Sequence, residues 1–488
     1  MYKQSKQASK QASKTLQEGV REKSRRNNAF TLIELLVVIA ILGVLATAVV
    51  LVINPAELLK QGRDATRLSD LAALSSALSL FTTDQWSQSL GSSTVTYLSL
   101  PEPTTAITDC SDLGFPAGYF HCAASSTYTK TDGTGWIPVN LNLISSGSPL
   151  SKLPVDPINS TSSNLYYAYW SNGTSYKIMA FPESQKYLAQ AASNSNMFQT
   201  GSNMNLGGGS SWALVPGNGS FGTKNFWVMQ YDAGCSDGNG NAVNSPLDGQ
   251  GYNWSTTACT GKVASVQGAA PIVDINHTQA VAACASIGAH LLTNDEYMTI
   301  ATNAANQGVN WSNGTVGSGV MSRGNSDSGA AQWSGSSQYG TGYSDFTHLR
   351  TMTLSDGSTL WDMAGNVWEH VQRSSNNTGD NTNTITTPTC SSGTPGTGEW
   401  CQYGSSLTPY ITAWNDSSFS AATVGPPNSS WNSNQNIGQV YGNDGSTYGS
   451  VFIRGGSWGD DSSAGPFTLS LNWGPSNTSY NVGFRCAR

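Results

Sequence analysis

A run of 24 mostly apolar residues, 30–53, most constrains what this chain can fold into. It contains one ionisable residue, Glu34, and as a helix it is long enough to cross a bilayer core of about 30 Å. The 29 residues before it carry eight basic and two acidic side chains. Basic residues beside a membrane span favour the cytoplasmic side, so the rest of the chain is predicted to be exported. No small-residue cleavage site follows the run, which indicates a retained segment rather than a secretory signal.

The helical pattern continues beyond this run after one interruption. Asn54-Pro55 predicts a kink, because Pro removes a backbone donor. Apolar residues then recur three or four positions apart and predict an amphipathic helix to about residue 84: Leu71, Leu74, Leu78 and Phe81. Short strand-like runs at 166–170 and 176–180 predict a small α/β head over residues 91–200.

The sequence Ala29-Phe-Thr-Leu-Ile-Glu34, followed by an apolar helix, resembles the signature of type IV pilins and pseudopilins. The resemblance implies that a prepilin peptidase removes the basic leader 1–29, so that Phe30 becomes an N-methylated terminus. Ala29 stands where family members usually carry Gly. The resemblance also implies that Glu34 neutralises the terminal amine of a neighbouring pilin subunit during assembly, since an unpaired carboxylate inside a membrane is costly. The alternatives are a plain membrane anchor and a glutamate that merely tolerates its interfacial depth.

The composition of the remaining chain describes a weakly charged, exported body. Only 11% of the residues are charged and the net charge is −7, so removal of the basic leader leaves a more acidic protein. Since no basic face is available outside the leader, nucleic-acid binding is excluded as the leading function. With 15 Trp and 19 Tyr, the chain can still bury sizeable cores. The Gly/Ser tract 201–211 predicts a linker to a large domain, 212–488.

Four motifs occur in order along this large domain. They are the helix–loop–helix pattern 280–297 with a capping box at Thr293-Asn-Asp-Glu296, Leu360-Trp-Asp-Met-Ala-Gly-Asn-Val-Trp-Glu-His370, Ile453-Arg-Gly-Gly-Ser-Trp458 and Val482-Gly-Phe-Arg-Cys486. Together they resemble the formylglycine-generating-enzyme, or sulfatase-modifying factor, family. The resemblance implies an α+β, C-type-lectin-like fold rich in irregular loops.

The resemblance does not extend to the chemistry of the family enzymes. These use a pair of closely spaced Cys between the last two motifs, as thiolate nucleophile and copper ligand. No Cys lies between Trp458 and Phe484, so we expect no catalytic residue and no enzyme activity. The five histidines show no metal-ligand spacing and are interpreted as surface or packing residues: His121, His277, His290, His348 and His370.

The segment 459–481, between the last two motifs, is small and polar with a few apolar interruptions. It resembles the variable region of retroelement-diversified proteins, which use this lectin-like branch for display. Adenine-directed mutagenesis of Asn codons in those proteins never yields Lys, Glu, Gln, Met or Trp. The first four are absent here, and Trp473 must then be templated. The alternative is an ordinary Asn/Ser-rich loop.

Short hydroxyl and amide groups beside aromatic rings suit a binding surface. The predicted ligand-binding residues are Gly459, Asp460, Asp461, Ser462, Ser463, Thr468, Ser470, Asn472, Trp473, Gly474, Thr478, Ser479 and Tyr480.

Eight cysteines in an exported chain predict disulfides. The family resemblance implies Cys284–Cys486, and proximity in the sequence suggests Cys110–Cys122, Cys235–Cys259 and Cys390–Cys401. The family also binds structural calcium, which implies Asn366 and Glu369 as candidate ligands, although each can equally hydrogen-bond its own loop. No other cofactor is expected.

The sequence therefore predicts an α+β chain with a leader 1–29, a pilin helix 30–90 whose half 30–53 crosses the membrane, a head 91–200, a linker 201–211 and a ligand-binding domain 212–488. Expected partners are other pilin subunits, prepilin peptidase, the membrane and an unknown protein or glycan on another cell. The expected location is the bacterial inner membrane before assembly and the cell surface, in a pilus or pseudopilus, afterwards. Two alternatives stay open: a structural minor pilin without variable binding, and a sulfatase-modifying enzyme.

Overall fold

The structure of the chain, a computed structural model, describes residues 32–92, 95–103, 109–115, 118–187, 197–204, 206, 211–237, 241–259, 262–373, 388–392, 399–415, 420–442 and 451–488. For residues 43–53 it describes the backbone alone. The predicted leader 1–29 and Phe30 lie outside the described residues, as do positions 205 and 207–210 of the predicted linker 201–211. The chain divides into two compact units, Met1–Leu59 and Lys60–Arg488.

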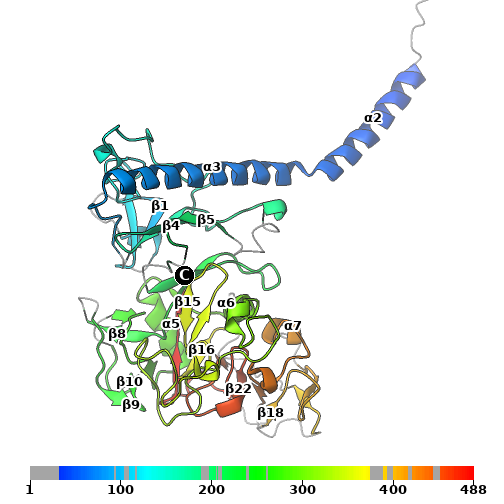
Figure 1. Ribbon diagram of the computed structural model, residues 1–488. Helices are drawn as coiled ribbons and strands as arrows, with labels where there is room; N and C mark the ends of the chain where they lie inside the picture. The colour runs from blue at the N-terminus through cyan, green and yellow to red at the C-terminus, as the bar shows by residue number, and fades with distance from the viewer. Residues whose placement is uncertain are drawn as a thin grey trace, which may run out of the picture. The chain divides into compact units, whose positions relative to one another are not determined.

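The first unit contains helix α2, Leu32–Ile53, and the first residues of helix α3, Pro55–Asp84 (Figure 1). Asn54 separates the two helices with a positive φ of 43°, and its backbone and side-chain oxygens both accept a hydrogen bond from the Glu57 N–H. The helix is thus interrupted at the predicted Asn54-Pro55 position and restarts there. Glu34 lies in the first turn of α2 and is exposed.

A helix both long and apolar enough to cross a membrane is not found among the described residues. The predicted span 30–53 falls largely outside those whose side chains are described, and it stays a prediction.

In the second unit, α3 packs against a five-stranded sheet with the order β2-β1-β3-β4-β5. The strands are β1 (Thr96–Glu102), β2 (Phe120–Ala124), β3 (Ala168–Ser171), β4 (Tyr176–Ala180) and β5 (Phe198–Gly201). Successive side chains of a strand point to opposite faces. One face buries Tyr97, Tyr169 and Ile178 in a core with the predicted stripe of α3, which comprises Leu71, Leu74, Leu78 and Phe81.

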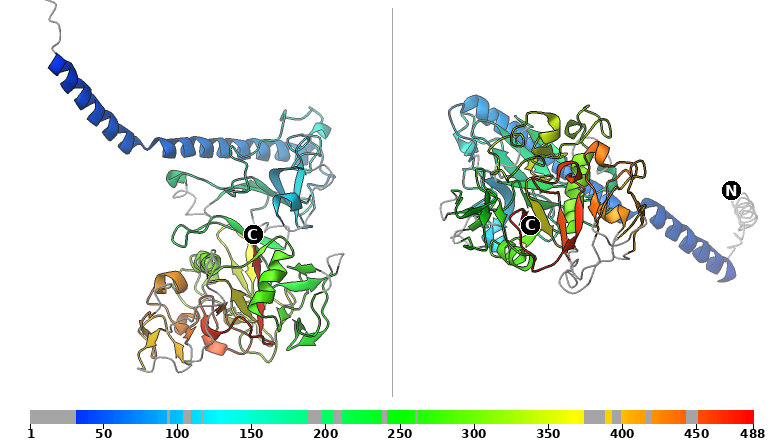
Figure 2. Two further views of the ribbon diagram at one scale, coloured as in Figure 1. Left: turned by 180° about the vertical axis from the view of Figure 1, so that it is seen from behind. Right: turned by 90° about the horizontal axis from the view of Figure 1, so that it is seen from below.

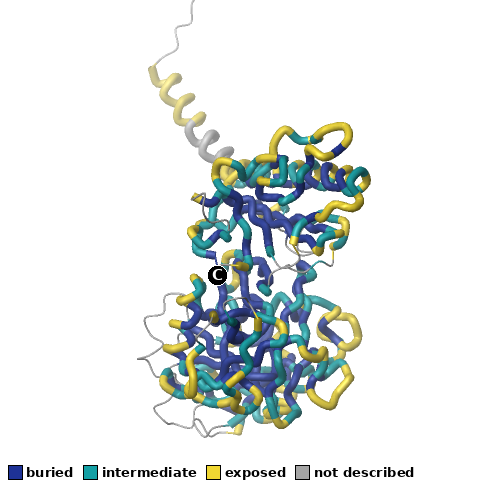
Figure 3. Tube along the Cα trace, turned by 90° about the vertical axis from the view of Figure 1, so that its left-hand side faces the viewer, coloured by how far each residue is buried: buried dark blue, intermediate teal, exposed yellow. Residues whose placement is uncertain are grey.

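The opposite face of this sheet lies in a second core, which it shares with the C-terminal part of the chain. Leu98, Trp170 and Met179 cluster there with Trp212 and Trp227, and the rings of Trp170 and Trp227 lie 6.0 Å apart. Because both of its faces are apolar, the sheet needs a covering layer on each side. The predicted head and the predicted large domain are joined by this core as well as by the chain (Figure 3), while the domain division itself stays a prediction.

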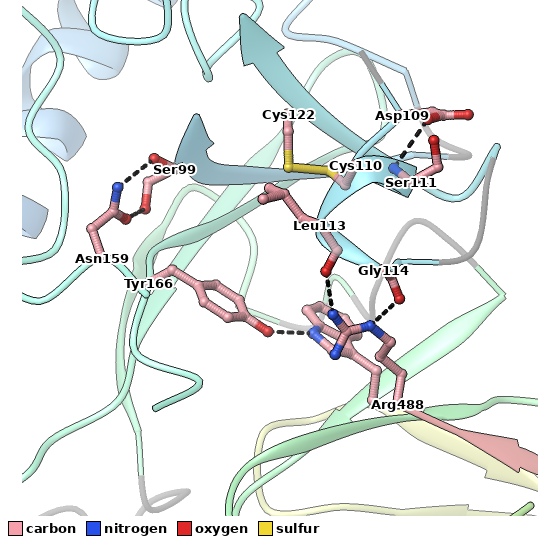
Figure 4. Close-up of a disulfide and its surroundings, with 11 residues drawn as sticks. Ser99, Asp109, Cys110, Ser111, Leu113, Gly114, Cys122, Asn159, Tyr166 and Arg488 are labelled. Atoms are coloured by element: carbon pink, nitrogen blue, oxygen red, sulfur yellow. Dashed lines mark hydrogen bonds between the residues drawn. A yellow bond between two sulfur atoms is a disulfide. The ribbon is translucent and has the colours of Figure 1, made fainter. Parts of the chain in front are cut away.

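The last residue of the chain is part of this junction (Figure 4). The Arg488 guanidinium donates hydrogen bonds to the backbone carbonyls of Leu113 and Gly114. The disulfide Cys110–Cys122 holds the same loop against strand β2. The C-terminus is therefore anchored to the head by donors that reach main-chain acceptors.

The C-terminal part builds two larger sheets (Figures 1 and 2). The first has the order β13 (His290–Leu291), β24 (Cys486–Ala487), β7 (Phe226–Met229) and β6 (Trp212–Val215). The second has the order β18 (Trp400–Cys401), β20 (Val440–Tyr441), β22 (Leu469–Trp473), β21 (Val451–Arg454), β16 (Trp368–Val371) and β23 (Val482–Phe484).

Smaller sheets and helices make up the rest of the regular structure described in this part. The strands are β8 (Gly234–Ser236), β9 (Leu247–Asp248), β10 (Gly251–Asn253), β11 (Lys262–Ala264), β12 (Ile272–Val273), β14 (Thr351–Thr353), β15 (Thr359–Trp361), β17 (Thr389–Cys390) and β19 (Ile411–Ala413). The helices are α5 (His277–Ala285), α6 (Asn294–Ala305) and α7 (Ala421–Val424). Thr293 and Glu296 form the capping box predicted for α6. The fold mixes helix and sheet and carries much irregular chain.

One buried cation ties α3 to the loops of the head. Arg67 donates from Nε and Nη2 to Asp156 at 2.6 and 2.9 Å, and from Nη1 to Asp64 and Glu183, both at 2.7 Å. Burial alone lowers the pKa of Arg67, but the bonds to these three carboxylates outweigh it and raise the pKa. The guanidinium therefore stays charged in the core of the head.

Replacing Arg67 by Ala leaves buried carboxylates without a cation, and we expect it to lower the free energy of unfolding by about 3–5 kcal/mol. Arg63→Ala is the matched control, because the Arg63 side chain pairs with Glu183 but is 30% exposed, and it should cost about 1 kcal/mol or less. Denaturant unfolding of the detergent-purified full chain measures both, and equal losses would contradict the central role of Arg67.

Candidate ligand-binding site

A buried guanidinium, that of Arg485, holds two strands of the six-stranded sheet together. Arg485 follows β23 and donates to Glu369 on β16 at 2.8 Å and to Asp232 at 3.0 Å. It also donates to the backbone carbonyls of Met229 and Trp361 at 2.8 and 2.7 Å. Burial alone lowers the pKa of Arg485, but Glu369 and Asp232 outweigh it and raise the pKa. Arg485 thus joins the motifs 360–370 and 482–486 through a permanent charge.

The two candidate calcium ligands are already occupied by protein partners. Asn366 Oδ1 accepts from the Gln332 N–H at 2.7 Å, and its Nδ2 donates to Asp232 at 2.9 Å. Glu369 accepts from the Arg485 guanidinium, whose charge repels a cation. Calcium needs about six to eight oxygen ligands, so the described geometry does not fit a calcium ion at this pair. Both residues instead bind side chains and backbone of distant segments, so the alternative that each bonds its own loop is not what these contacts show.

The structure pairs all eight cysteines, as the sequence analysis expects. The disulfides are Cys110–Cys122, Cys235–Cys259, Cys284–Cys486 and Cys390–Cys401. Cys284–Cys486 joins α5 to β24. Since no cysteine is free, the described chain offers no thiolate nucleophile.

A pocket of about 290 Å³ lies on the six-stranded sheet. Each strand of the sheet contributes to it: Trp400 from β18, Tyr441 from β20, Ser470, Asn472 and Trp473 from β22, Ile453 from β21, Trp368 from β16 and Val482 from β23. Asp460 and Asn481 complete the lining from the adjoining loops. A pocket with apolar and aromatic walls and a few polar groups has the usual character of a ligand site.

An irregularity in β22 turns two adjacent residues toward this pocket. Leu469 and Leu471 point into the large core, while Ser470 and Asn472 line the pocket, as the alternation of a strand requires. Trp473 breaks the alternation because the pairing of β21 with β22 shifts in register, which inserts an extra residue in β22. The wall therefore gains an indole beside an amide.

Four aromatic residues line the pocket. Trp368 and Trp400 are stacked with their ring centres 6.3 Å apart, and Trp400 and Tyr441 lie 5.0 Å apart. Trp473 packs in the same small cluster as Trp368, and its indole N–H has no acceptor among the described residues. Trp400, Tyr441 and Trp473 are only partly buried, so part of each ring remains accessible.

Asp460 is the charged group of the pocket. One of its carboxylate oxygens accepts from the Ser457 N–H and Oγ, both at 2.6 Å. Burial raises the pKa of Asp460, and hydrogen bonds from Ser457 and Trp368 oppose that effect. Within the described part of the chain, no cationic side chain neutralises this carboxylate.

The neighbouring carboxylate has the opposite environment. Asp461 pairs with Arg323 at 2.8 Å, and Arg323 also pairs with Asp327 at 2.7 Å. The hydrogen bond from Arg323 lowers the pKa of Asp461. Of the two adjacent acids, only Asp461 has a cation beside it.

The structure divides the predicted ligand-binding residues into three groups. The pocket is lined by Asp460, Ser470, Asn472 and Trp473. Exposed or half-buried outside it are Gly459, Asp461, Ser462, Ser463, Thr478, Ser479 and Tyr480. Thr468 and Gly474 are buried, and the Thr468 hydroxyl donates to the Ser463 carbonyl at 2.7 Å, so it stabilises the loop.

Sequence reasoning misses several lining residues, above all Trp368, Trp400 and Tyr441. Trp368 lies inside the motif 360–370, two positions before His370 on the same strand. The alternation of side chains along a strand places both residues on one face. Trp400 and Tyr441 lie in two-residue strands without any periodic pattern. No local signal marks them.

Two of the five histidines are packed against each other. The rings of His277 and His370 lie 5.7 Å apart, and both residues are buried. Burial lowers the pKa of His277 to about 4 and that of His370 to about 3. The His370 Nε2 lies 3.1 Å from the Ile275 carbonyl. Both are packing residues held neutral by the fold.

These two histidines predict a pH-dependent stability. An unfolded His has a pKa of about 6.5, so between about pH 6.5 and pH 4 the unfolded chain binds protons that the folded chain does not. The free energy of unfolding should therefore fall on acidification through this window, by about 1.4 kcal/mol per pH unit for each histidine.

Unfolding of the full chain at several pH values measures this slope. His277→Gln and His370→Gln should each flatten it, because each replacement removes one of the two buried imidazoles. An unchanged slope in the double variant His277→Gln/His370→Gln would refute the assignment.

The sequence of the chain matches two protein-family profiles. Residues 174–488 match the family described as the sulfatase-modifying factor enzyme 1-like domain. Residues 24–50 match the prokaryotic N-terminal methylation motif, which contains Ala29, Phe30 and Glu34. No curated protein matches the chain.

Solved structures similar to the chain include the Major Tropism Determinant I1 variant, at 15% identity and a TM-score of 0.21, with 54% of this chain and 50% of that chain covered. The Major Tropism Determinant U1 variant matches at 14% identity and a TM-score of 0.26, with 65% of each chain covered. Treponema denticola variable protein 1 matches at 14% identity and a TM-score of 0.23, with 56% of this chain and 90% of that chain covered. The chain thus spans half to two thirds of the length of the first two.

Proposed function

This chain belongs to the family of sulfatase-modifying factor enzyme 1-like domains, and from that premise we propose that its C-terminal part is a non-catalytic ligand-binding domain carried by a pilin-like N-terminus. The observation that carries the proposal is the pocket on the six-stranded sheet, which takes lining residues from every strand and Asp460, Ser470, Asn472 and Trp473 from the segment 459–481. The proposed ligand is a protein or glycan on another cell.

The N-terminal methylation motif supports the pilin half of the proposal. In this proposal prepilin peptidase cleaves after Ala29, and other pilin subunits assemble with the mature chain through Glu34. The protein then passes from the bacterial inner membrane, anchored by 30–53, to a pilus or pseudopilus at the cell surface.

Diversification of the segment 459–481 by a retroelement is a further part of the proposal. Several of its polar residues are exposed or line the pocket, where replacements leave the core intact. A reverse-transcriptase gene and a near-copy of the 459–481 coding segment in the neighbouring DNA would support it, and their absence would remove it while leaving binding in place.

Family membership is the observation that favours a second candidate, a sulfatase-modifying enzyme. The paired state of all eight cysteines weighs against it, because the family reaction needs thiolates. Formation of formylglycine from a sulfatase peptide by the purified full chain would decide for the enzyme.

Binding through the pocket is tested with Trp400→Ala and Trp473→Ala in the purified full chain, probed on protein and glycan arrays. Removing a central aromatic wall should weaken binding about tenfold or more, since such residues commonly dominate an interface. Trp86→Ala is the matched control, because Trp86 is 86% exposed and lies outside the pocket. Array binding that survives both pocket replacements, together with altered filaments, would favour the structural minor pilin instead.

Processing is tested by mass spectrometry of the mature chain. We expect it to begin at N-methylated Phe30, and Ala29→Arg should prevent cleavage by placing a bulky cation at the cut. Glu34→Ala should leave cleavage intact but reduce incorporation into filaments, because the terminal amine of the neighbour loses its partner. A mature chain that still carries residues 1–29 would contradict the pilin assignment.

A further inference from the structure

The charge balance of the pocket suggests the chemistry of its ligand. Asp460 lies at the pocket with a carboxylate that no cation among the described residues neutralises, whereas Asp461 beside it pairs with Arg323. Removing a carboxylate from water is costly unless opposite charge or hydrogen bonds replace the water. Ser457 and Trp368 supply hydrogen bonds but no positive charge.

The aromatic wall reinforces the negative field at this place. The faces of Trp and Tyr rings carry partial negative charge and attract cations, most strongly when water is excluded. Trp368, Trp400, Trp473 and Tyr441 all line the same pocket as Asp460. Four aromatic side chains that line one pocket together with a carboxylate form an environment that favours a positively charged group.

Two of the remaining polar residues of the lining, Asn481 and Ser470, have hydrogen-bond partners within the chain. Asn481 Oδ1 accepts from the Ser479 hydroxyl at 2.6 Å, and its Nδ2 donates to Ser457 Oγ at 3.3 Å. Ser470 Oγ accepts from the Asn472 N–H at 3.4 Å. Asp460 is the charged residue among those that line the pocket, so the ligand charge that complements the lining is positive.

We propose that the pocket binds an alkylammonium group, with Asp460 facing its charge and the rings of Trp368, Trp400, Trp473 and Tyr441 surrounding its carbon atoms. The proposal rests on the binding function proposed above and narrows it to cationic ligands. Two sources supply this chemistry: the side chain of a lysine on a partner protein, and a quaternary ammonium group such as that of choline.

Isothermal titration of the detergent-purified full chain with choline and with N-acetyl-lysine methylamide tests the proposal and separates the two sources. The source that binds more tightly is assigned as the natural class. Dimethylbutanol, the neutral carbon isostere of choline, is the matched ligand control and should bind about tenfold or more weakly if the charge is recognised.

Asp460→Asn keeps the shape of the side chain and its ability to accept from Ser457, and it should weaken binding of the preferred cation about tenfold. Trp473→Leu provides a second test through the aromatic wall, and Trp86→Ala should bind as the unchanged chain does. A melting temperature close to that of the unchanged chain shows that each variant is folded.

Equal binding of choline and dimethylbutanol, or no binding of either cation, would overturn the inference. If the arrays identify a ligand that requires Trp400 and Trp473 but neither cation competes with it, the cationic assignment fails while the proposed binding function stands. If array binding does not depend on Trp400 and Trp473, the proposed binding function of the pocket itself fails.

Discussion

The buried Arg485 guanidinium is the interaction on which the C-terminal sheets depend. Taking a guanidinium out of water is costly, so Glu369, Asp232 and two main-chain carbonyls must be held around it at the same time. These groups come from segments far apart in the sequence, and satisfying Arg485 brings them together. Strands β16 and β23 thereby become neighbours, with Trp368 paired to Val482. Because side chains alternate along β16, Glu369 serves the interior while Trp368 lines the pocket on the other face.

The five-stranded sheet has a comparable role in the head, because it carries an apolar core on each face. One core contains the stripe of α3 and the other contains residues of β6 and β7. The Gly/Ser composition of 201–211 predicts independent motion of the head and the large domain. The core that they share and the Arg488 contacts to Leu113 and Gly114 oppose such motion. The pocket-bearing part is therefore packed against the head within the unit Lys60–Arg488.

Features that depend on neighbouring residues were predictable from the sequence. The interruption at Asn54 follows from the missing backbone donor of Pro55. The buried stripe from Leu71 to Phe81 and the capping box of α6 follow from spacings of three or four residues. The pocket does not, because Trp400 and Tyr441 reach it through two-residue strands paired over long distances in the chain. Trp473 could be identified as a binding candidate, but its entry beside Asn472 depends on a bulge that only the pairing with β21 creates.

Strand alternation also explains how a binding surface of this kind can vary without loss of the fold. Along β22, Ser470 and Asn472 belong to the pocket, while Leu469 and Leu471 belong to the large core and share its close packing. Amino-acid replacements confined to the polar positions Ser470 and Asn472 would thus change only the face of β22 that lines the pocket. Thr468 sets a limit to this freedom, because it is buried and its hydroxyl donates to the Ser463 carbonyl. If the segment is diversified as proposed, the templated Trp473 keeps one aromatic wall constant, and variation at the other positions alters the groups around a permanent ring.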